Sequence, residues 1–310
     1  MSPSRHPPAT SRAGFTLIEI VVVLFIMGVI ISMAAVLTRG VTAAQQRSIT
    51  STRLAAIDAA LVQFVQQQRR LPCPALGTRA STATTTPLPG DEYNRTTGGC
   101  QPVAGAFETS GVVPYRMLGL TENDITDGWG RRITYRIDPA LAAEAALDMT
   151  GCDAAGQEAP RFSTNPGPAA TVARACNTAC TSTALTSCTE PGVFIIGKGL
   201  TVKNVAGLIL MNPNPGAGIV NTGAAYVLIS HGESGGGGYL NTGTLSTSNS
   251  TDGTEEMKNY ASGSWVSAAL TYYVDDSTSD IAGTTHFDDV VLRPSVMNVI
   301  SRAGLGPRTH

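Results

Sequence analysis

The chain has 310 residues, of which 42% are hydrophobic, 5% aromatic and 14% charged, with 33 glycines and 18 prolines. Globular proteins usually contain about 25% charged residues, but the ordinary hydrophobic fraction excludes disorder of the whole chain. The length suffices for one large domain or two smaller ones. A formal net charge of −2 and only three lysines argue against nucleic-acid binding. Only one stretch is apolar and long enough to span a bilayer, which excludes a multi-pass membrane protein.

That apolar stretch comes first in chain order, at residues 15–37, where 19 of 23 residues are hydrophobic. A helix of this length covers roughly 34 Å, enough for a hydrocarbon core of about 30 Å. It is too long for the apolar core of a cleaved secretory signal. The preceding leader, residues 1–14, carries Arg5 and Arg12 and no acidic residue. This asymmetry predicts a cytoplasmic N-terminus and a C-terminal bulk on the other side of the membrane.

One carboxylate, Glu19, interrupts the apolar stretch five residues from its start. On insertion scales a charged residue near a bilayer centre costs about 2.5–3.5 kcal/mol, so such groups are functional candidates. A plain membrane anchor has no need of this charge. We therefore expect Glu19 to require a partner of opposite charge.

The string GFTLIE at residues 14–19, after a short basic leader, resembles the processing site of type IV pilins and type II secretion pseudopilins. In that family a membrane-bound prepilin peptidase cuts after the glycine and methylates the new N-terminal residue. The resemblance implies that Gly14 marks the cut and that Phe15 becomes the methylated N-terminus. It also implies that Glu19 meets the terminal amine of a neighbouring subunit. A buried carboxylate and a buried ammonium satisfy each other, whereas either alone is costly.

The resemblance further implies a structural subunit, a minor pilin or pseudopilin, and not an enzyme. Such a subunit lies in the bacterial inner membrane with its head in the periplasm, and then enters a filament or reaches the cell surface. Its partners would be prepilin peptidase, other pilin or pseudopilin subunits, the inner-membrane assembly platform and lipid around residues 15–37. No nucleic acid is expected. Both a type II secretion filament and a type IV pilus remain open.

The implied fold is α+β and pilin-like, with a long N-terminal helix packed on an antiparallel β-sheet head, residues 71–310. The strings LPCPA at 71–75 and FDDVV at 287–291 also resemble a subgroup of large minor pilins. The size of the head favours a minor component, because bulk is best tolerated at a filament tip. The head carries 14 basic and 21 acidic residues, which disfavours it as a DNA receptor.

Helical character is predicted to continue past the apolar stretch, through an amphipathic stem at residues 38–70. No proline occurs between Phe15 and Leu71, and the residue preceding Pro72 disfavours helix. We therefore expect one continuous helix from about residue 15 to residue 68, whose second half lays an apolar stripe on the head. Apolar residues recur at spacings of three and four along this stripe, namely Leu54, Ile57, Leu61, Phe64 and Val65.

All six cysteines lie in the predicted head, and an even count in an oxidising compartment predicts disulfides. Cys73 and Cys100 are separated in sequence from the other four and are the preferred pair. The other four lie in a low-complexity insert at about 139–191, where three pairings are open. A zinc site is the disfavoured alternative there, because the spacings lack paired C-x2–4-C knuckles. These four are Cys152, Cys176, Cys180 and Cys188.

Strands are predicted within the head. An Asp-Gly turn at 127–128, followed by alternating apolar residues up to Ile137, indicates a turn that enters a strand. This segment resembles the Asp-x-Trp-Gly…Tyr segment of pseudopilin heads, which implies that Trp129 and Tyr135 pack onto the stem helix. Further strands are expected at 193–196, 205–211, 225–230 and 289–292.

A Gly-x-Ser-x-Gly string at 232–236 follows a predicted strand and centres on Ser234. A nucleophile elbow needs such a motif to turn into a helix, but the four glycines at 235–238 are typical of a tight or flexible loop. The internal histidines of the head are His231 and His286. An extracellular serine hydrolase is therefore an unfavoured alternative. A pilin-anchored adhesin or receptor, with ligand-facing Ser/Thr/Gly-rich loops, is the other alternative.

Acidic residues near the C-terminus form a calcium candidate. Ca²⁺ is bound by several oxygens from acidic loops, and some major pseudopilins bind Ca²⁺ in a C-terminal loop. The EF-hand spacing is absent, and exposed acids more often form turns or a solvated surface. No other cofactor is expected. The candidate ligands are Asp275, Asp276, Asp280, Asp288 and Asp289.

Overall fold

A computed structural model describes residues 17–96, 99–100, 111–150, 197–213, 223–247, 252–260, 272–279 and 285–306, without the side chains of 33–40. Several predicted features lie outside these ranges. They are Gly14, Phe15, Asp280, the strand at 193–196 and the insert cysteines Cys152, Cys176, Cys180 and Cys188.

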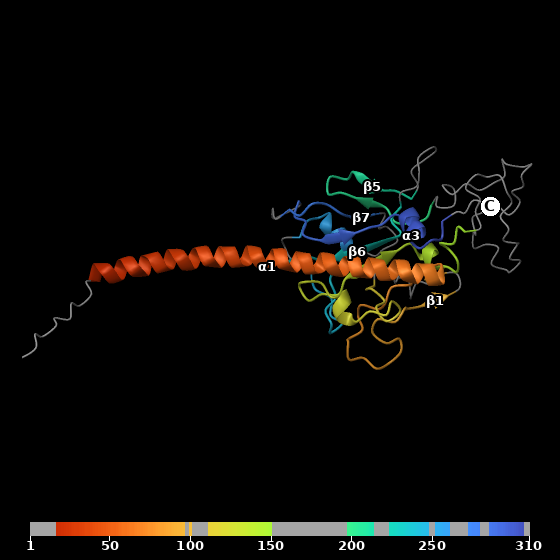
Figure 1. The fold of residues 1–310 in the computed structure, drawn as a ribbon, viewed down its shortest axis with the longest axis horizontal. Helices are drawn as coiled ribbons and strands as arrows, with labels where there is room; N and C mark the ends of the chain where they lie inside the picture. Colours follow the sequence, from red (N-terminus) through yellow and green to blue (C-terminus); the bar gives the residue numbers. More distant parts are fainter. Residues whose placement is uncertain are drawn as a thin grey trace, which may run out of the picture. The chain divides into compact units, whose positions relative to one another are not determined.

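A 52-residue helix, α1, begins at Leu17 and ends at Gln68 (Figure 1). It ends where the sequence predicts, because Arg69 takes a left-handed backbone conformation with φ of 58° and Pro72 follows. The chain divides into two compact units, Met1–Gln45 and Gln46–His310, so the helix contributes to both.

In the first unit, the helix from Leu17 to Ser32 exposes its side chains, most of them large and apolar. Across the part of the chain that the structure describes, no helix combines the length and the apolar character needed to cross a membrane.

The second unit is built on a three-stranded antiparallel sheet of order β3-β6-β8, formed by Thr134–Ile137, Tyr226–Ser230 and Val290–Leu292. Tyr135 pairs with Leu228, which in turn pairs with Leu292. All five residues of the central strand are buried, as expected for an uninterrupted apolar run between two neighbours. These three strands occupy the positions that the sequence predicts for them.

The predicted antiparallel pairing holds for the first sheet, but the second sheet is mixed. Its order is β5-β4-β7, formed by Ile209–Met211, Val202–Lys203 and Tyr273–Val274. The β4–β5 pair is an antiparallel hairpin, but β4 and β7 run parallel. Parallel pairing needs a long crossover, and a long stretch of chain separates these two strands. The predicted strand at 205–211 is shorter in the structure, because Asn204 Oδ1 accepts from Leu208 N and closes a turn there.

Short elements complete the head. A two-stranded ribbon joins β1 to β2, and single turns of 3-10 helix form η2, η3 and η6. The helix α3 near the C-terminus starts at the side-chain cap of Ser295, whose hydroxyl accepts from Asn298 N. The bounds are Arg95–Thr96 (β1), Gly99–Cys100 (β2), Glu122–Ile125 (η2), Pro139–Ala142 (η3), Glu256–Asn259 (η6) and Val296–Arg302 (α3).

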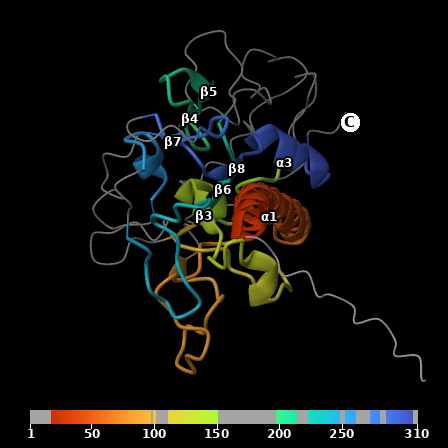
Figure 2. The ribbon, with the colours of Figure 1, turned by 90° about the vertical axis from the view of Figure 1, so that its left-hand side faces the viewer.

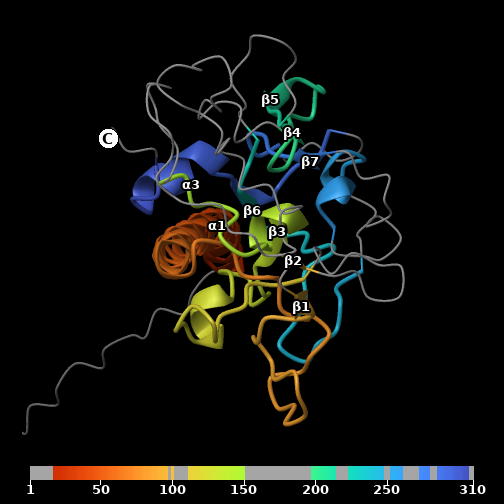
Figure 3. The ribbon, with the colours of Figure 1, turned by 90° about the vertical axis from the view of Figure 1, so that its right-hand side faces the viewer.

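One hydrophobic core joins the second half of α1 to the head. Figures 2 and 3 show this half of the helix beside α3 and the β3–β6–β8 sheet. Full burial of a large apolar side chain contributes about 1.5–3 kcal/mol, so the stripe on α1 stabilises the unit substantially. Phe64, the fifth residue of the predicted stripe, is also buried, and the Arg70 guanidinium lies 5.2 Å from its ring centroid. The helix residues in the core are Leu54, Ile57, Leu61 and Val65.

The start of the predicted insert belongs to this same core. Leu141, Leu147 and Met149 are fully buried within it, and Leu147 N donates to Arg69 O just beyond α1. The sequence does not reveal this because apolar residues in single turns lack a regular period. Of the predicted insert at 139–191, residues 151–191 lie outside the described ranges.

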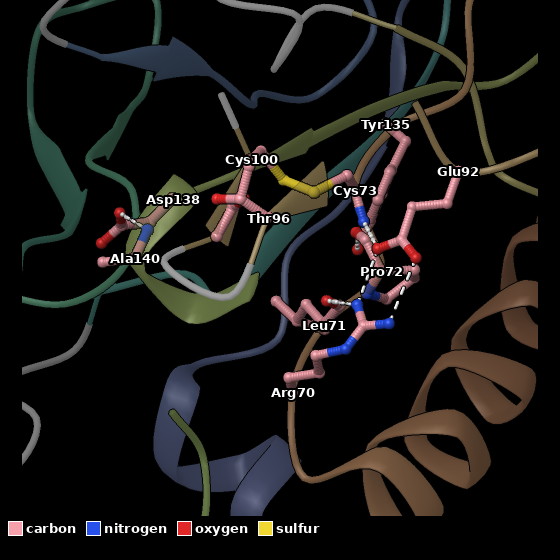
Figure 4. Close-up of a disulfide and its surroundings, with 11 residues drawn as sticks. Arg70, Leu71, Pro72, Cys73, Glu92, Thr96, Cys100, Tyr135, Asp138 and Ala140 are labelled. Atoms are coloured by element: carbon pink, nitrogen blue, oxygen red, sulfur yellow. Dashed lines mark hydrogen bonds and ion pairs between the residues drawn. A yellow bond between two sulfur atoms is a disulfide. The ribbon is translucent and has the colours of Figure 1, made fainter. Parts of the chain in front are cut away.

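A disulfide joins the predicted pair, Cys73 and Cys100, across 27 positions of sequence (Figure 4). Glu92 lies beside it and accepts from Cys73 N at 2.7 Å. The same carboxylate receives two bonds from the Arg70 guanidinium, at 2.6 and 3.1 Å. Both side chains are nearly fully buried, so this two-pronged pair fixes the chain where it leaves α1.

We expect the double substitution Cys73→Ala/Cys100→Ala to lower the free energy of unfolding by about 3–4 kcal/mol, because the unfolded chain regains the entropy of a closed loop. Chemical unfolding of the full chain in detergent, followed by near-UV circular dichroism, measures this change. Because the double variant lacks the Cys73–Cys100 bond, breaking that bond with a reductant cannot lower its free energy of unfolding further. An unchanged unfolding midpoint in the double variant would contradict the prediction.

Candidate functional site

Glu19 lies in the first turn of α1, where the amide dipoles of a helix favour a negative charge. It is exposed on the helix surface, as are Leu17, Ile18 and Ile20 around it. The carboxylate therefore lies on an apolar helix surface two residues from the start of the described chain. The predicted cleavage residues Gly14 and Phe15 precede that start.

A polar contact fixes the second half of α1 to two elements of the head. The carboxylate of Asp58 accepts from Tyr226 OH at 2.5 Å, and its other oxygen receives a bond from Arg302 at 2.6 Å. Tyr226 lies in β6 and Arg302 at the end of α3. Burial and the adjacent carboxylate raise the pKa of Tyr226 well above its usual range, so it stays a donor. One buried acid on the helix thus engages both the sheet and the C-terminal helix.

The predicted Asp-Gly turn forms a second attachment to α1. Gly128 N donates to Thr50 Oγ1 at 2.9 Å, and Arg53 donates to the backbone oxygens of Thr126 and Asp127. A Cβ on Gly128 would lie 2.3 Å from the backbone oxygen of Gln46 on α1. Only glycine allows this approach, so the turn packs directly on the helix backbone.

Of the two aromatic residues expected at the head–stem contact, one lies in the core that contains the stem residues and the other does not. Tyr135 lies in β3, is fully buried in the core that contains the stem residues, and donates from its hydroxyl to Pro72 O at 3.2 Å. Its ring also contacts that of Tyr226, with centroids 6.2 Å apart. Trp129 is half-buried in the Asp-Gly turn and is not a member of that core cluster.

The Gly-x-Ser-x-Gly loop is not arranged as a serine–histidine pair in the part of the chain that the structure describes. Ser234 donates from its Oγ to Asp288 at 3.0 Å and from its N to the other oxygen of that carboxylate at 2.6 Å. The Nε2 atom of His231 lies 2.9 Å from Thr134 Oγ1. Gly232 has φ of 49°, and a Cβ there would lie 2.4 Å from Asp288 O. The glycines therefore allow this loop to close over an acidic group.

The calcium candidates do not form one cluster among the described residues. Asp275 pairs with Arg293 at 2.5 Å. Asp276 accepts from Val205 N at 3.0 Å at the β4–β5 turn. Asp288 and Asp289, in contrast, are buried in the head.

The structure brings Asp288 and Asp289 together with residues that the sequence analysis did not select. Glu256 shares one group of candidate metal ligands with these two, and it shares a second group with Asp252 and His286. The sequence does not reveal Asp252, Glu256 and His286 as ligands, because they come from two segments that no spacing motif connects. The one available signal was the Asp-Gly-Thr-Glu-Glu run at 252–256, which is acidic within a chain of low charge.

The N-terminal sequence matches a known family signature. Residues 10–35 match the family described as the prokaryotic N-terminal methylation motif, the signal of type IV pilins and pseudopilins. The match includes the predicted cut site, Glu19 and most of the apolar stretch. No curated protein and no solved structure matches the chain. The chain thus carries the signal of a pilin-like substrate of prepilin peptidase.

The two buried tyrosines at the stem provide a matched test of the Asp58 contact. We expect Tyr226→Phe to lower the free energy of unfolding by about 1.5–3 kcal/mol, because it removes a hydrogen bond to a charged group. Tyr135→Phe should cost only about 0.5–1.5 kcal/mol, because its hydroxyl bonds to a neutral backbone oxygen. Chemical unfolding of both variants measures the difference. Equal losses, or a larger loss in Tyr135→Phe, would contradict the role assigned to Asp58.

Proposed function

We propose that the chain is a structural subunit of a type IV pilus-like or type II secretion filament, processed by prepilin peptidase and assembled through its N-terminal helix. The observation that carries the proposal is the methylation motif at residues 10–35, within which the helix α1 begins at Leu17. No loop separates the N-terminal half of α1 from its second half, which is part of the head core. Any force on the helix therefore reaches the head through packed side chains.

The first half of α1 suits a role in assembly. Its large apolar side chains are exposed around the whole helix surface between Leu17 and Ser32. A helix that is apolar all round needs lipid or other helices as its surroundings. We propose that this stretch lies in the inner membrane before assembly and among the helices of other subunits afterwards, with the head on the periplasmic side.

The size of the head supports a minor position in the filament. The β3-β6-β8 sheet, α3 and the disulfide-linked segment share one core with the apolar stripe of α1, and the second sheet adds a further cluster to the head. A head with this much chain is more easily accommodated at a filament tip than in a repeating shaft. A tip position is therefore part of the proposal.

Processing gives the most direct test. We expect the mature protein, extracted from membranes of cells that contain prepilin peptidase, to begin at a methylated Phe15. Intact-mass and N-terminal peptide mass spectrometry measure both features. Substitution of Gly14 by a bulky residue, such as Gly14→Val, should leave the leader attached. An unmethylated terminus, or cleavage at another residue, would contradict the proposed processing.

Glu19 tests assembly separately from processing. We expect Glu19→Gln to be inserted and cleaved normally but to enter filaments poorly, because it keeps the side-chain shape and loses the charge that meets a terminal ammonium. Co-purification with partner subunits after membrane extraction measures incorporation. Ser32→Ala, a neutral change in the same half of the helix, is the control. Incorporation of Glu19→Gln at the wild-type level would refute the electrostatic role.

A further inference from the structure

Four carboxylates lie together in the interior of the head, on the side of the glycine-rich loop. Asp252, Glu256, Asp288 and Asp289 have exposed fractions of 8%, 0%, 3% and 3%. An isolated ionised carboxylate in a protein interior is strongly disfavoured unless a cation or hydrogen bonds compensate it. The position of these four acids therefore requires a physical explanation.

Their ligand atoms converge on two adjoining positions that share one residue. Asp252, Glu256 and His286 each offer one ligand atom, and these three atoms all lie within 4.8 Å of one another. Glu256, Asp288 and Asp289 satisfy the same limit. Glu256, at the start of the η6 turn, is thus the common member.

Imidazoles, and not lysine or arginine, lie beside two of these acids. Among the described residues, no lysine or arginine forms an ion pair with Glu256, Asp288 or Asp289, whereas His286 lies 2.8 Å from Glu256 and His231 lies 3.7 Å from Asp289. Arg136 is buried nearby, but its Nη2 donates to the backbone oxygens of Asn259 and Tyr260.

The acids show the electrostatic cost of this arrangement. Burial and the nearby Asp289 raise the pKa of Glu256 to about 7. Burial raises the pKa of Asp289 well above its usual range, although Asn259 donates to it at 2.8 Å.

A buried imidazole provides independent evidence for a ligand. The side chain of His231 is fully buried, and its Nε2 is engaged with Thr134. Its Nδ1 has no hydrogen-bond partner among the described residues and faces Asp289 Oδ1 at 3.7 Å, beyond hydrogen-bonding distance. Burial and the nearby Arg136 lower the pKa of His231 to about 3, so the ring is neutral. When Nε2 donates to Thr134, the Nδ1 lone pair is directed into the acidic cluster.

The second imidazole lies on the other side of Glu256. His286 Nδ1 is 2.8 Å from Glu256 Oε2, and the side chain of His286 is 12% exposed. The backbone holds Glu256 from both sides, because its Oε1 accepts from Asp288 N at 2.7 Å and its Oε2 from Gly253 N at 3.1 Å. The ligand atoms are therefore positioned before any ion arrives, and His286 is in part accessible to solvent.

We propose that this cluster is a divalent-cation site in which Glu256 is the central ligand, with Asp252 and His286 on one side and Asp288 and Asp289 on the other. A mixed set of carboxylates and imidazole suits Mn²⁺ or Zn²⁺, whereas Ca²⁺ takes six to eight oxygen ligands. The bound ion would connect η6 to the segment that leads into β8, and would draw the glycine-rich loop to them through Asp288.

The test uses the full chain, purified in detergent and stripped of metal with a chelator. We expect one equivalent of Mn²⁺ or Zn²⁺ to bind per chain on titration, measured by elemental analysis after gel filtration. The same ions should raise the thermal unfolding midpoint, because an ion that binds only the folded state stabilises it. Absence of both binding and a thermal shift would overturn the proposal. Binding of Ca²⁺ with none of Mn²⁺ or Zn²⁺ would also overturn it, because the imidazole would then have no role.

Glu256→Gln is the decisive variant, since it keeps the side-chain shape and removes the central charge. We expect it to lose at least tenfold in Mn²⁺ affinity and to lose the metal-dependent thermal shift. Glu233→Gln, which removes an exposed acid from the glycine-rich loop, should bind as the wild type does. If near-UV circular dichroism shows that Glu256→Gln is unfolded, His286→Gln takes its place and should also lose at least tenfold. Wild-type affinity in the folded variant would refute the site.

Discussion

The structure of the head depends on the burial of one side of α1. Leu54, Ile57, Leu61 and Val65 provide one wall of a core whose other walls are β3, β6, the 3-10 turn η3 and α3. These elements come from distant parts of the chain, and the helix contributes apolar side chains to the core that they share. The helix is thus a component of the fold of the head as well as an attachment to it, and processing at its start leaves that core untouched.

Polar contacts give this apolar packing a defined register. Hydrophobic burial alone tolerates small rotations or shifts of a helix, since it is non-directional. The bond from Gly128 N to Thr50 and the contacts of Asp58 with Tyr226 and Arg302 have fixed directions and lie two helical turns apart. The Arg70–Glu92 pair then fixes the exit of the chain. These contacts hold the second half of α1 and the head in one register within the second unit of the chain.

The sequence predicts those parts of the fold that have a local period or a local turn signal. The 3.6-residue stripe on α1, the alternating strand at 133–137 and the Asp-Gly turn are of this kind, and the cleavage motif is a contiguous string. The parallel pairing of β4 with β7 has no such signal, because two-residue strands show no alternation. The acidic cluster is equally hidden. Its members at 252–256 and 286–289 become neighbours only through tertiary packing, and the regular calcium-loop spacing that would have linked them is absent.

Four buried acids are unusual in a chain with so few charged residues. With only 14% charged residues, the chain could satisfy its interior with apolar and hydroxyl side chains, as it does through most of the core. Replacing a buried ionic group with apolar residues is often neutral or stabilising, so structural stability alone does not account for four carboxylates in one place. The hydrogen bonds from Ser234, Asn259 and two backbone amides orient the carboxylates but do not neutralise them. The proposed divalent cation would supply the missing charge at the point where the glycine-rich loop, η6 and the segment before β8 meet.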